Sequence, residues 1–401
     1  MANNNKHTGP NVPALRFPEF SGEWTKIKLR DLGSFFSGGT PSSSRKDYYG
    51  GEIPFIRSGE LHSDSTALSI TKEAYDSCSA KMVNKGDLLL ALYGATSGDI
   101  SISRICGAIN QAILCIRPQY MDAYFIKSLW EKHKKHILET YLQGGQGNLS
   151  SEIIKNISFF FPNSDEQVKI SRLIHIIDDR IETQSKIIEE LKTLRGALNE
   201  SLYCCCESYQ ELSLNDVGVS YSGLSGKSGN DFGSGYPFIP YTNIFTNNII
   251  DEGQLDYVQV REDESQNSVC FGDLLMTLSS ETPEEVGIGA VYLGHESPLY
   301  LNSFAFGIHI TRTDLVYPPY LSWLVSTKSF RKFILPYAQG STRYNLQKTD
   351  FMKAKYRFPT LRRQKAISEL LSGYSSKIEN EERVLNKYTA LKQGLIEQLF
   401  I

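Results

Sequence analysis

The sequence lacks any long hydrophobic run. Of its 401 residues, 40% are hydrophobic and 22% are charged, as in ordinary globular proteins, and no apolar stretch approaches the roughly 20 residues of a membrane-spanning helix. The first ten residues, MANNNKHTGP, also lack the basic, apolar and small-residue regions of a secretion signal. We therefore expect a cytoplasmic protein with room for two or three domains.

Cysteine pairs at metal-binding or disulfide spacing are also missing. The seven cysteines include no CxxC pair, and three of them, Cys204, Cys205 and Cys206, are adjacent. Because zinc and disulfide frameworks need spaced pairs, the cysteines predict reduced thiols and no metal site.

Motifs for catalysis are absent as well. Gly226-Lys227-Ser228 has Tyr221 where a phosphate-binding loop needs its first glycine. The Tyr317-Pro318-Pro319-Tyr320 segment lacks the leading Asn or Asp of amino-methyltransferases, and the start of a helix explains its prolines better. No GxSxG elbow, HExxH pair or convincing carboxylate cluster is present. The sequence thus predicts a non-catalytic chain.

What the sequence does contain is a long heptad pattern from Gln167 to Tyr203. Eight of the ten positions spaced alternately four and three residues apart are apolar, which predicts a coiled-coil helix of roughly 55 Å. Pro162 precedes it, and Ser164 with Gln167 has the spacing of a capping box. The seam consists of Ile170, Ile174, Ile177, Ile181, Gln184, Ile188, Leu191, Arg195, Leu198 and Leu202.

The whole pattern recurs 197 residues further along the chain. Gln364 takes the place of Gln167, and the second seam reads Ile367, Leu371, Tyr374, Ile378, Glu381, Leu385, Tyr388, Lys392, Leu395 and Leu399. The preceding segment recurs with it, since Gly86-Asp87-Leu88-Leu89 returns as Gly272-Asp273-Leu274-Leu275. The chain is therefore predicted to be a tandem duplication of a globular domain followed by a long helix.

The predicted fold class is α+β, with a mixed α/β domain and a coiled-coil helix each occurring twice. We expect an N-terminal arm at residues 1–21, a first globular domain at 22–162, a first helix at 163–206, a second domain at 207–359 and a second helix at 360–401. Strand-like apolar runs separated by glycine, proline and serine fill both globular domains.

The two seams favour antiparallel pairing of the helices. A parallel pair in register would set Arg195 against Lys392, two like charges. An antiparallel pair instead puts Arg195 near Tyr374 and Lys392 near Ile177, with the two cations roughly 27 Å apart. Such pairing would give the chain a pseudo-two-fold axis, so that one chain imitates a symmetric dimer.

Loops with amide, hydroxyl, aromatic and cationic side chains give the clearest binding signal. Such groups can read base edges and hold phosphates, although turn chemistry alone explains many of them. Residues Lys328 to Lys365 contain eleven Lys or Arg and one acid, Asp350, which fits either a solvated face or a phosphate-contacting surface. The candidate DNA-binding residues are Arg57, Tyr93, Thr96, Ser97, Arg104, Gln143, Gln146 and Asn148 in the first half, and Tyr241, Asn243, Ser279, Ser280, Arg343, Tyr344, Asn345 and Lys348 in the second.

Several short motifs together carry a resemblance to a known family. They are Ser37-Gly38-Gly39-Thr40-Pro41-Ser42, Tyr49-Gly50-Gly51-Glu52-Ile53-Pro54-Phe55-Ile56, Lys85-Gly86-Asp87-Leu88-Leu89, and Pro162 followed by Asp165-Glu166-Gln167. With the duplication, they resemble the DNA specificity (S) subunit of type I restriction-modification systems, over essentially the whole chain. The second half departs from this pattern, because Leu224 replaces Gly39, Gly226 replaces Pro41 and Arg363 replaces Glu166.

The resemblance implies two target-recognition domains, each reading one half of a bipartite DNA site, joined by helices that set the spacer. Half-sites about one duplex turn, roughly 34 Å, apart would suit such a chain. The resemblance further implies two modification subunits, which use S-adenosylmethionine to methylate adenine, and two ATP- and Mg-dependent restriction subunits, acting in host defence against foreign DNA. It implies no cofactor and no metal on this chain.

Two other functions stay open at this point. A stand-alone bipartite DNA-binding or architectural protein would bind its site tightly with no partner present. An intrinsic methyltransferase or nuclease would bind S-adenosylmethionine or cut DNA by itself. The half-site sequences and the spacer length depend on loop geometry and DNA shape, which the sequence does not specify.

Overall fold

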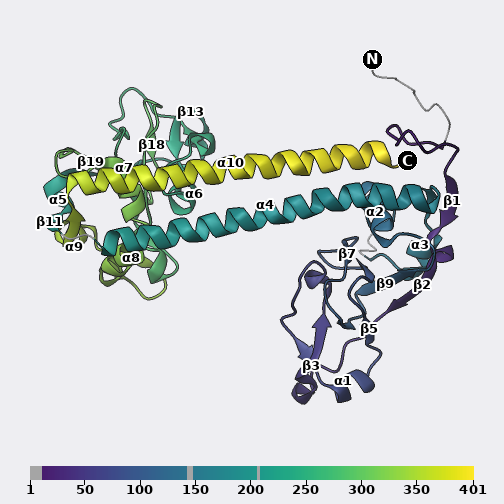
Figure 1. Cartoon of the computed structure of the whole chain (residues 1–401). Helices are drawn as coiled ribbons and strands as arrows, with labels where there is room; N and C mark the ends of the chain where they lie inside the picture. The colour runs from purple at the N-terminus through teal and green to yellow at the C-terminus, as the bar shows by residue number, and fades with distance from the viewer. Residues whose placement is uncertain (1–10, 142–147, 206–207) are drawn as a thin grey trace. The chain divides into compact units, whose positions relative to one another are not determined.

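The computed structural model describes residues 11–141, 148–205 and 208–401 of the chain (Figure 1). It divides into two compact units, the first made of Met1–Ser185 with Arg383–Ile401 and the second of Lys186–Glu382. Each unit thus holds one globular domain and one half of each long helix. The predicted segment boundaries treat each helix as a segment of its own, and they stay a prediction. None of the described helices is long and apolar enough to cross a membrane.

The first unit is built on two four-stranded sheets, with strand orders β2-β9-β6-β7 and β4-β3-β8-β5. A third, two-stranded ladder joins β1 to β10. The strands are β1 (Thr25–Lys28), β2 (Gly33–Ser37), β3 (Tyr49–Ile56), β4 (Ser69–Ile70), β5 (Lys81–Val83), β6 (Leu88–Ala91), β7 (Ile100–Ile102), β8 (Gly107–Ile109), β9 (Ile113–Pro118) and β10 (Ser158–Phe161), and the short helices are α1 (Lys72–Asp76), α2 (Ala123–Tyr141) and α3 (Ser151–Asn156).

Helix α2 covers one face of the central sheet of this unit. Its residues Phe125, Leu129 and Trp130 recur at helical spacing and are buried with Leu88 and Leu114 of the sheet. The indole Nε1 of Trp130 donates a hydrogen bond to the Gly98 carbonyl at 2.8 Å. The apolar stripe of α2 therefore fixes the helix on the sheet and holds the turn that follows β6.

The second unit repeats this design, with strand order β12-β19-β15-β17 in its central sheet. Smaller sheets have the orders β14-β13-β18, β16-β21-β20 and β11-β22. The strands are β11 (Tyr209–Ser213), β12 (Gly218–Ser222), β13 (Phe232–Ile239), β14 (Asp256–Val258), β15 (Leu274–Thr277), β16 (Ser279–Ser280), β17 (Gly289–Val291), β18 (Tyr300–Leu301), β19 (Ala305–Ile310), β20 (Ala338–Gln339), β21 (Tyr344–Leu346) and β22 (Lys355–Pro359), and the short helices are α5 (Leu214–Val217), α6 (Tyr241–Thr246), α7 (Pro318–Leu324), α8 (Lys328–Ile334) and α9 (Lys348–Lys353). Pro318 and Pro319 open α7, where their missing N–H groups cost nothing.

The duplication predicted from the sequence extends to individual hydrogen bonds. The side-chain Nε2 of Gln167 donates to the Pro162 carbonyl at 2.9 Å, and that of Gln364 donates to the Pro359 carbonyl at 2.8 Å. Both glutamines are buried and accept a backbone N–H through Oε1. The two halves therefore share one way of joining the globular domain to its long helix.

The N-cap of the first long helix differs from the prediction. Helix α4 (Ser164–Cys204) begins one residue after Asn163, whose side-chain oxygen accepts the Glu166 N–H at 2.9 Å. Asn163 rather than Ser164 is therefore the cap, since a cap residue must precede the first helical turn. Glu166 is instead paired with Arg16, 2.7 Å away, and both side chains are buried.

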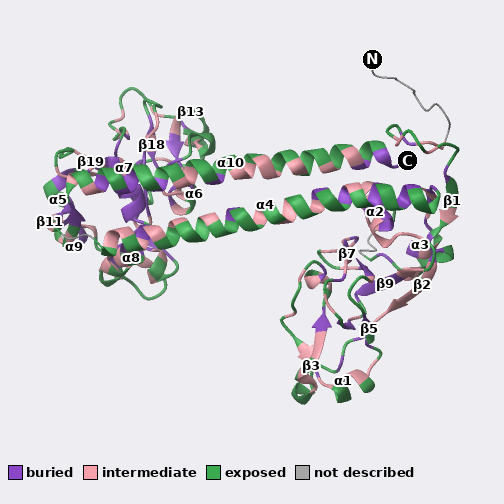
Figure 2. Cartoon of the chain, viewed as in Figure 1, coloured by how far each residue is buried: buried purple, intermediate pink, exposed green. Residues whose placement is uncertain are grey.

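Helices α4 and α10 (Leu361–Leu399) run antiparallel, as predicted. In the second unit Arg195 Nη1 donates to Ser375 Oγ at 2.8 Å, and Lys192 Nζ lies 3.0 Å from Glu382. In the first unit Lys392 Nζ lies 2.8 Å from Asp178. The two seam cations thus contact the residues directly after the predicted Tyr374 and Ile177. Buried and exposed residues alternate along both helices (Figure 2).

Candidate nucleic-acid interface

In the second unit, strand pairing gathers predicted residues that lie far apart in the sequence. Strand β16 pairs antiparallel with β21, so that Ser279 faces Asn345 and Ser280 faces Tyr344. The Leu346 N–H donates to the Leu278 carbonyl at 2.8 Å and extends the ladder by one residue. This ladder brings the loop after β15 and the loop before α9 to one place.

A hollow of about 600 Å³ opens beside this ladder. The Tyr241 hydroxyl donates to the Ser279 carbonyl at 3.0 Å and ties α6 to one wall. Ser280 Oγ donates to Glu285 at 2.8 Å. The lining residues are Tyr241, Phe245, Ser279, Ser280, Glu281, Glu285, Phe304, Thr342 and Arg343. Aromatic faces, carboxylates and a guanidinium are therefore collected in one concave surface.

Arg343 is the cationic side chain among the lining residues of this hollow. Its guanidinium lies 5.5 Å from the ring centroid of Phe304, a side chain that is itself 52% exposed. No carboxylate of the described residues forms an ion pair with Arg343, which leaves its fork of donors open to a ligand. Such a fork matches the O6 and N7 atoms of guanine or the oxygens of a phosphate.

Lys348 and Asn345 frame the same loop. Lys348 is the first residue of α9, and its Nζ lies 4.9 Å from the buried Phe306 ring. Burial lowers the pKa of the Lys348 ammonium. Asn345 is exposed. The amide of Asn345 is therefore the freer of these two groups to contact a nucleic acid.

Asn243, a candidate DNA-binding residue, lies inside the second unit and stabilises its fold. Its side chain is fully buried. Its Nδ2 donates to the carbonyls of Asp251 and Gln254 at 2.9 and 3.1 Å, and its Oδ1 accepts the Asp251 N–H. The residue closes the turn after α6 and exposes no atom to DNA, so we exclude it from the proposed interface.

The first unit pairs the two corresponding loops in the same way but with different side chains. Tyr93 forms an isolated antiparallel bridge with Asn148, and the Leu149 N–H donates to the Leu92 carbonyl at 2.8 Å. Thr96 and Ser97 lie in the turn after Tyr93, where Ser97 Oγ donates to the Leu92 carbonyl at 3.1 Å. The predicted residues Gln143 and Gln146 lie outside the described residues.

Two predicted arginines of the first unit are held by carboxylates. Arg104 Nη2 lies 2.9 Å from Glu182 on α4, and the Arg57 side chain lies 3.2 Å from Glu60. The hydrogen bond with Glu60 raises the pKa of Arg57. Arg104 thus links the central sheet to the long helix, whereas Arg57 closes the turn after β3.

Sequence reasoning missed part of the hollow. Glu281 and Thr342 directly follow or precede predicted residues, and extending each loop by one position finds them. Phe245 lies in α6, Glu285 in a short 3-10 helix and Phe304 in a turn, so three separate segments supply them. Phe304 lies in the turn between β18 and β19, and no sequence pattern marks it.

Comparison with known proteins finds a match to one protein family in the first half of the chain. A family model described as the type I restriction modification DNA specificity domain matches residues 21–193. The first half of the chain is therefore similar to this specificity domain. The matched residues contain the first globular domain and the first three quarters of α4, including the motifs of the first half.

Relatives within the specificity family match parts of the chain. The MjaIX specificity subunit of Methanocaldococcus jannaschii is 28% identical over 207 residues, which are 48% of this chain and 47% of that protein. The HindI specificity subunit of Haemophilus influenzae is 27% identical over 154 residues, 35% of this chain and 32% of that protein. The matched part thus spans about half or less of the length of these relatives.

Solved structures of the specificity family share the fold. A type I restriction-modification S subunit from M. genitalium has a TM-score of 0.57 at 15% identity, and the match covers 97% of this chain and 99% of that one. A chain from a structure of type I restriction-modification complex assembly has a TM-score of 0.58 at 12% identity, with 94% and 97% covered. These matches support the α+β architecture with its two long helices.

Proposed function

We propose that the chain is the DNA specificity subunit of a type I restriction-modification complex and that each globular domain reads one half of a bipartite site. One observation carries the proposal. The same backbone ladder, Leu149 to Leu92 in the first unit and Leu346 to Leu278 in the second, carries different side chains in the two units. A common scaffold with divergent loops suits two domains that recognise different sequences.

The proposed contacts follow from the chemistry of the side chains. In the second domain Arg343 donates to guanine or phosphate, Asn345 reads adenine or a backbone oxygen, and Tyr241 and Tyr344 supply polar aromatic edges. In the first domain Tyr93, Thr96, Ser97 and Asn148 occupy the corresponding place. Lys348 and the neighbouring cations add phosphate attraction.

The long helices act as the spacer between the half-sites and as the docking surface for two modification subunits. In this proposal, S-adenosylmethionine binds to the modification subunits, and ATP and Mg to two restriction subunits. The chain itself contributes recognition and geometry and performs no chemical step. Its affinity for DNA should fall steeply with salt, because phosphate contacts release counterions.

Expression of the chain with a type I modification subunit in a host without adenine methylation tests the proposal. We expect methylated adenines within one bipartite motif, detected by sequencing of the host DNA. Methylation of the same motif without this chain would refute the specificity role. Tight sequence-specific binding by the chain alone, with no methylation in the co-expressing host, would favour the stand-alone DNA-binding protein.

A further inference from the structure

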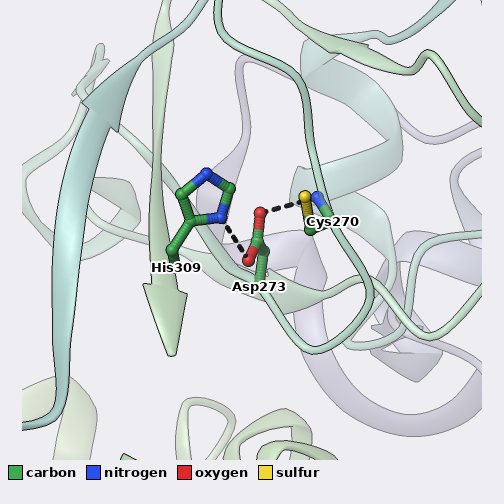
Figure 3. A group of neighbouring side chains, drawn as sticks. All are labelled: Cys270, Asp273 and His309. Atoms are coloured by element: carbon green, nitrogen blue, oxygen red, sulfur yellow. Dashed lines mark hydrogen bonds and ion pairs between the residues drawn. The ribbon is translucent and has the colours of Figure 1, made fainter. Parts of the chain in front are cut away.

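Three side chains with metal-binding atoms meet at the edge of the central sheet of the second unit (Figure 3). They are Cys270, in the turn before β15, Asp273, directly before β15, and His309 on β19. One ligand atom from each lies within 4.8 Å of the others. The Asp273 side chain is buried, whereas Cys270 and His309 are reached by solvent.

Hydrogen bonds hold the Asp273 carboxylate in one orientation. Its Oδ2 accepts from the Tyr221 hydroxyl at 2.7 Å and from the Cys270 N–H at 2.8 Å. Its Oδ1 faces the Nδ1 of His309 at 2.8 Å. Oδ2 is therefore held by Tyr221 and Cys270, and Oδ1 points at His309, another candidate ligand. Supporting hydrogen bonds of this kind orient carboxylate ligands in metal sites.

The first unit provides an internal comparison for this cluster. Asp87 corresponds to Asp273, and its Oδ2 accepts the Asn84 N–H at 2.8 Å, as Asp273 does from Cys270. Arg117 Nη2 lies 2.6 Å from Asp87. Strand register places Arg117 opposite Ser34 in the first unit and His309 opposite Val219 in the second, which makes them equivalent positions.

The two units therefore place different side chains beside the equivalent carboxylates of Asp87 and Asp273. In the first, the guanidinium of Arg117 is charged at every physiological pH. In the second, an imidazole replaces the guanidinium and a thiol replaces the Asn84 side chain. A bound cation would supply the positive charge that the arginine supplies in the first unit.

We propose that Cys270, Asp273 and His309 form a binding site for a divalent ion of the zinc class. Thiolate sulfur, imidazole nitrogen and carboxylate oxygen are the ligand types that zinc takes. The three residues fill three positions of a tetrahedral site, and water fills the fourth on the exposed side. On binding, the Cys270 thiol loses its proton to solvent and His309 offers the lone pair of Nδ1. The ion links the segment directly before β15 to strand β19.

Cobalt(II) binding to the full chain tests this site. The adjacent thiols are first removed by Cys204→Ser, Cys205→Ser and Cys206→Ser, and bound metal is stripped with a chelator. We expect one cobalt ion per chain and a thiolate-to-cobalt charge-transfer absorption in the near ultraviolet, which zinc then displaces. Absence of a stoichiometric ion, or an absorption that survives Cys270→Ser, would overturn the proposal.

His309→Arg gives a variant that separates metal binding from folding. It recreates the arginine–aspartate pair of the first unit, so the chain should fold and unfold at its usual temperature without metal while binding no cobalt. Tyr221→Phe removes one supporting hydrogen bond and should weaken zinc about tenfold in calorimetric titration. Cys106→Ser, at an exposed cysteine of the first unit, should leave binding unchanged. Unaltered zinc affinity in His309→Arg would contradict the assignment.

Discussion

At the scale of single residues, the partners of a side chain decide whether it can read DNA. Arg343 lies over Phe304 without a carboxylate partner among the described residues, whereas Arg104 is paired with Glu182 at 2.9 Å. Both are exposed arginines in loops or turns, and the sequence treats them alike. Their availability differs because ion pairing occupies the donors of only one of them.

Replacement of Arg343 by alanine should relax one position of the second domain's half-site. Loss of a bidentate guanidinium contact removes about 1–3 kcal/mol of discrimination against the wrong base. Sequencing of methylated host DNA should show that position becoming degenerate while the other half-site stays fixed. Arg312→Ala, which removes an exposed arginine paired with Asp314 in the same unit, should leave the motif intact. If Arg343→Ala instead weakened DNA binding equally for all sequences and reduced the dependence of affinity on salt, Arg343 would be a phosphate contact.

Replacement of Asn243 by alanine should destabilise the second unit without changing sequence preference. The substitution leaves the carbonyls of Asp251 and Gln254 without their buried donor. Each such unsatisfied group costs about 1–3 kcal/mol. Urea unfolding measures the loss, and the methylation motif should stay as in the parent chain. A motif altered at one base would show that this side chain reaches DNA after all.

At the scale of elements, partly buried charges fasten the long helices in the first unit. Asp178 of α4 lies near Lys127 of α2 and Lys392 of α10, and it accepts a hydrogen bond from the Tyr124 hydroxyl. Burial alone would raise the pKa of Asp178, but the two lysines and the tyrosine hold it below its usual value. Burial likewise opposes the charge of Lys392, and Glu131 and Asp178 raise its pKa above the usual value.

The stability of the first unit should therefore fall with acid in a way that depends on Asp178. Its folded pKa lies below the unfolded value of about 3.9, so its contribution is complete above that pH and is lost as pH falls through the folded pKa. Asp178→Asn should lower the free energy of unfolding by about 1–3 kcal/mol at neutral pH, and the deficit should shrink with acid.

Urea titrations across the acid range, on the parent chain and on Asp178→Asn, measure this difference. Asp314→Asn serves as the control, because its pair with Arg312 is exposed and screened by water. It should change unfolding little at any pH. A deficit in Asp178→Asn that stays constant down to strongly acid pH would show that the carboxylate charge does not stabilise the helices.

At the scale of the whole molecule, the proposed function makes helix length a determinant of the DNA site. Insertion of four residues after Lys192 and four before its partner Glu382 keeps the pairing in register and lengthens both helices by about 6 Å. The gap between the half-sites should grow by roughly two base pairs at about 3.4 Å each. The methylated motif shows both the bases of the half-sites and the length of the gap between them. Changed half-site bases with an unchanged gap would refute the spacer role.

The duplication, the two long helices and their antiparallel pairing can be predicted from the sequence alone. These follow from the apolar heptads and from the two seam cations Arg195 and Lys392, because periodicity and like-charge repulsion can be read along the chain. Arg195 contacts Ser375, one residue after the predicted Tyr374. Lys392 contacts Asp178, one residue after the predicted Ile177.

Which polar side chains share a site depends on the tertiary structure. It joined Ser279 to Asn345, buried Asn243, paired Arg104 with the helix and brought Cys270 toward Asp273 and His309. The absence of spaced cysteine pairs argued against a metal site, and the site that we propose takes its third ligand, His309, from strand β19. Apolar periodicity is a local property of the sequence, whereas the partners of a polar group are set by long-range strand pairing.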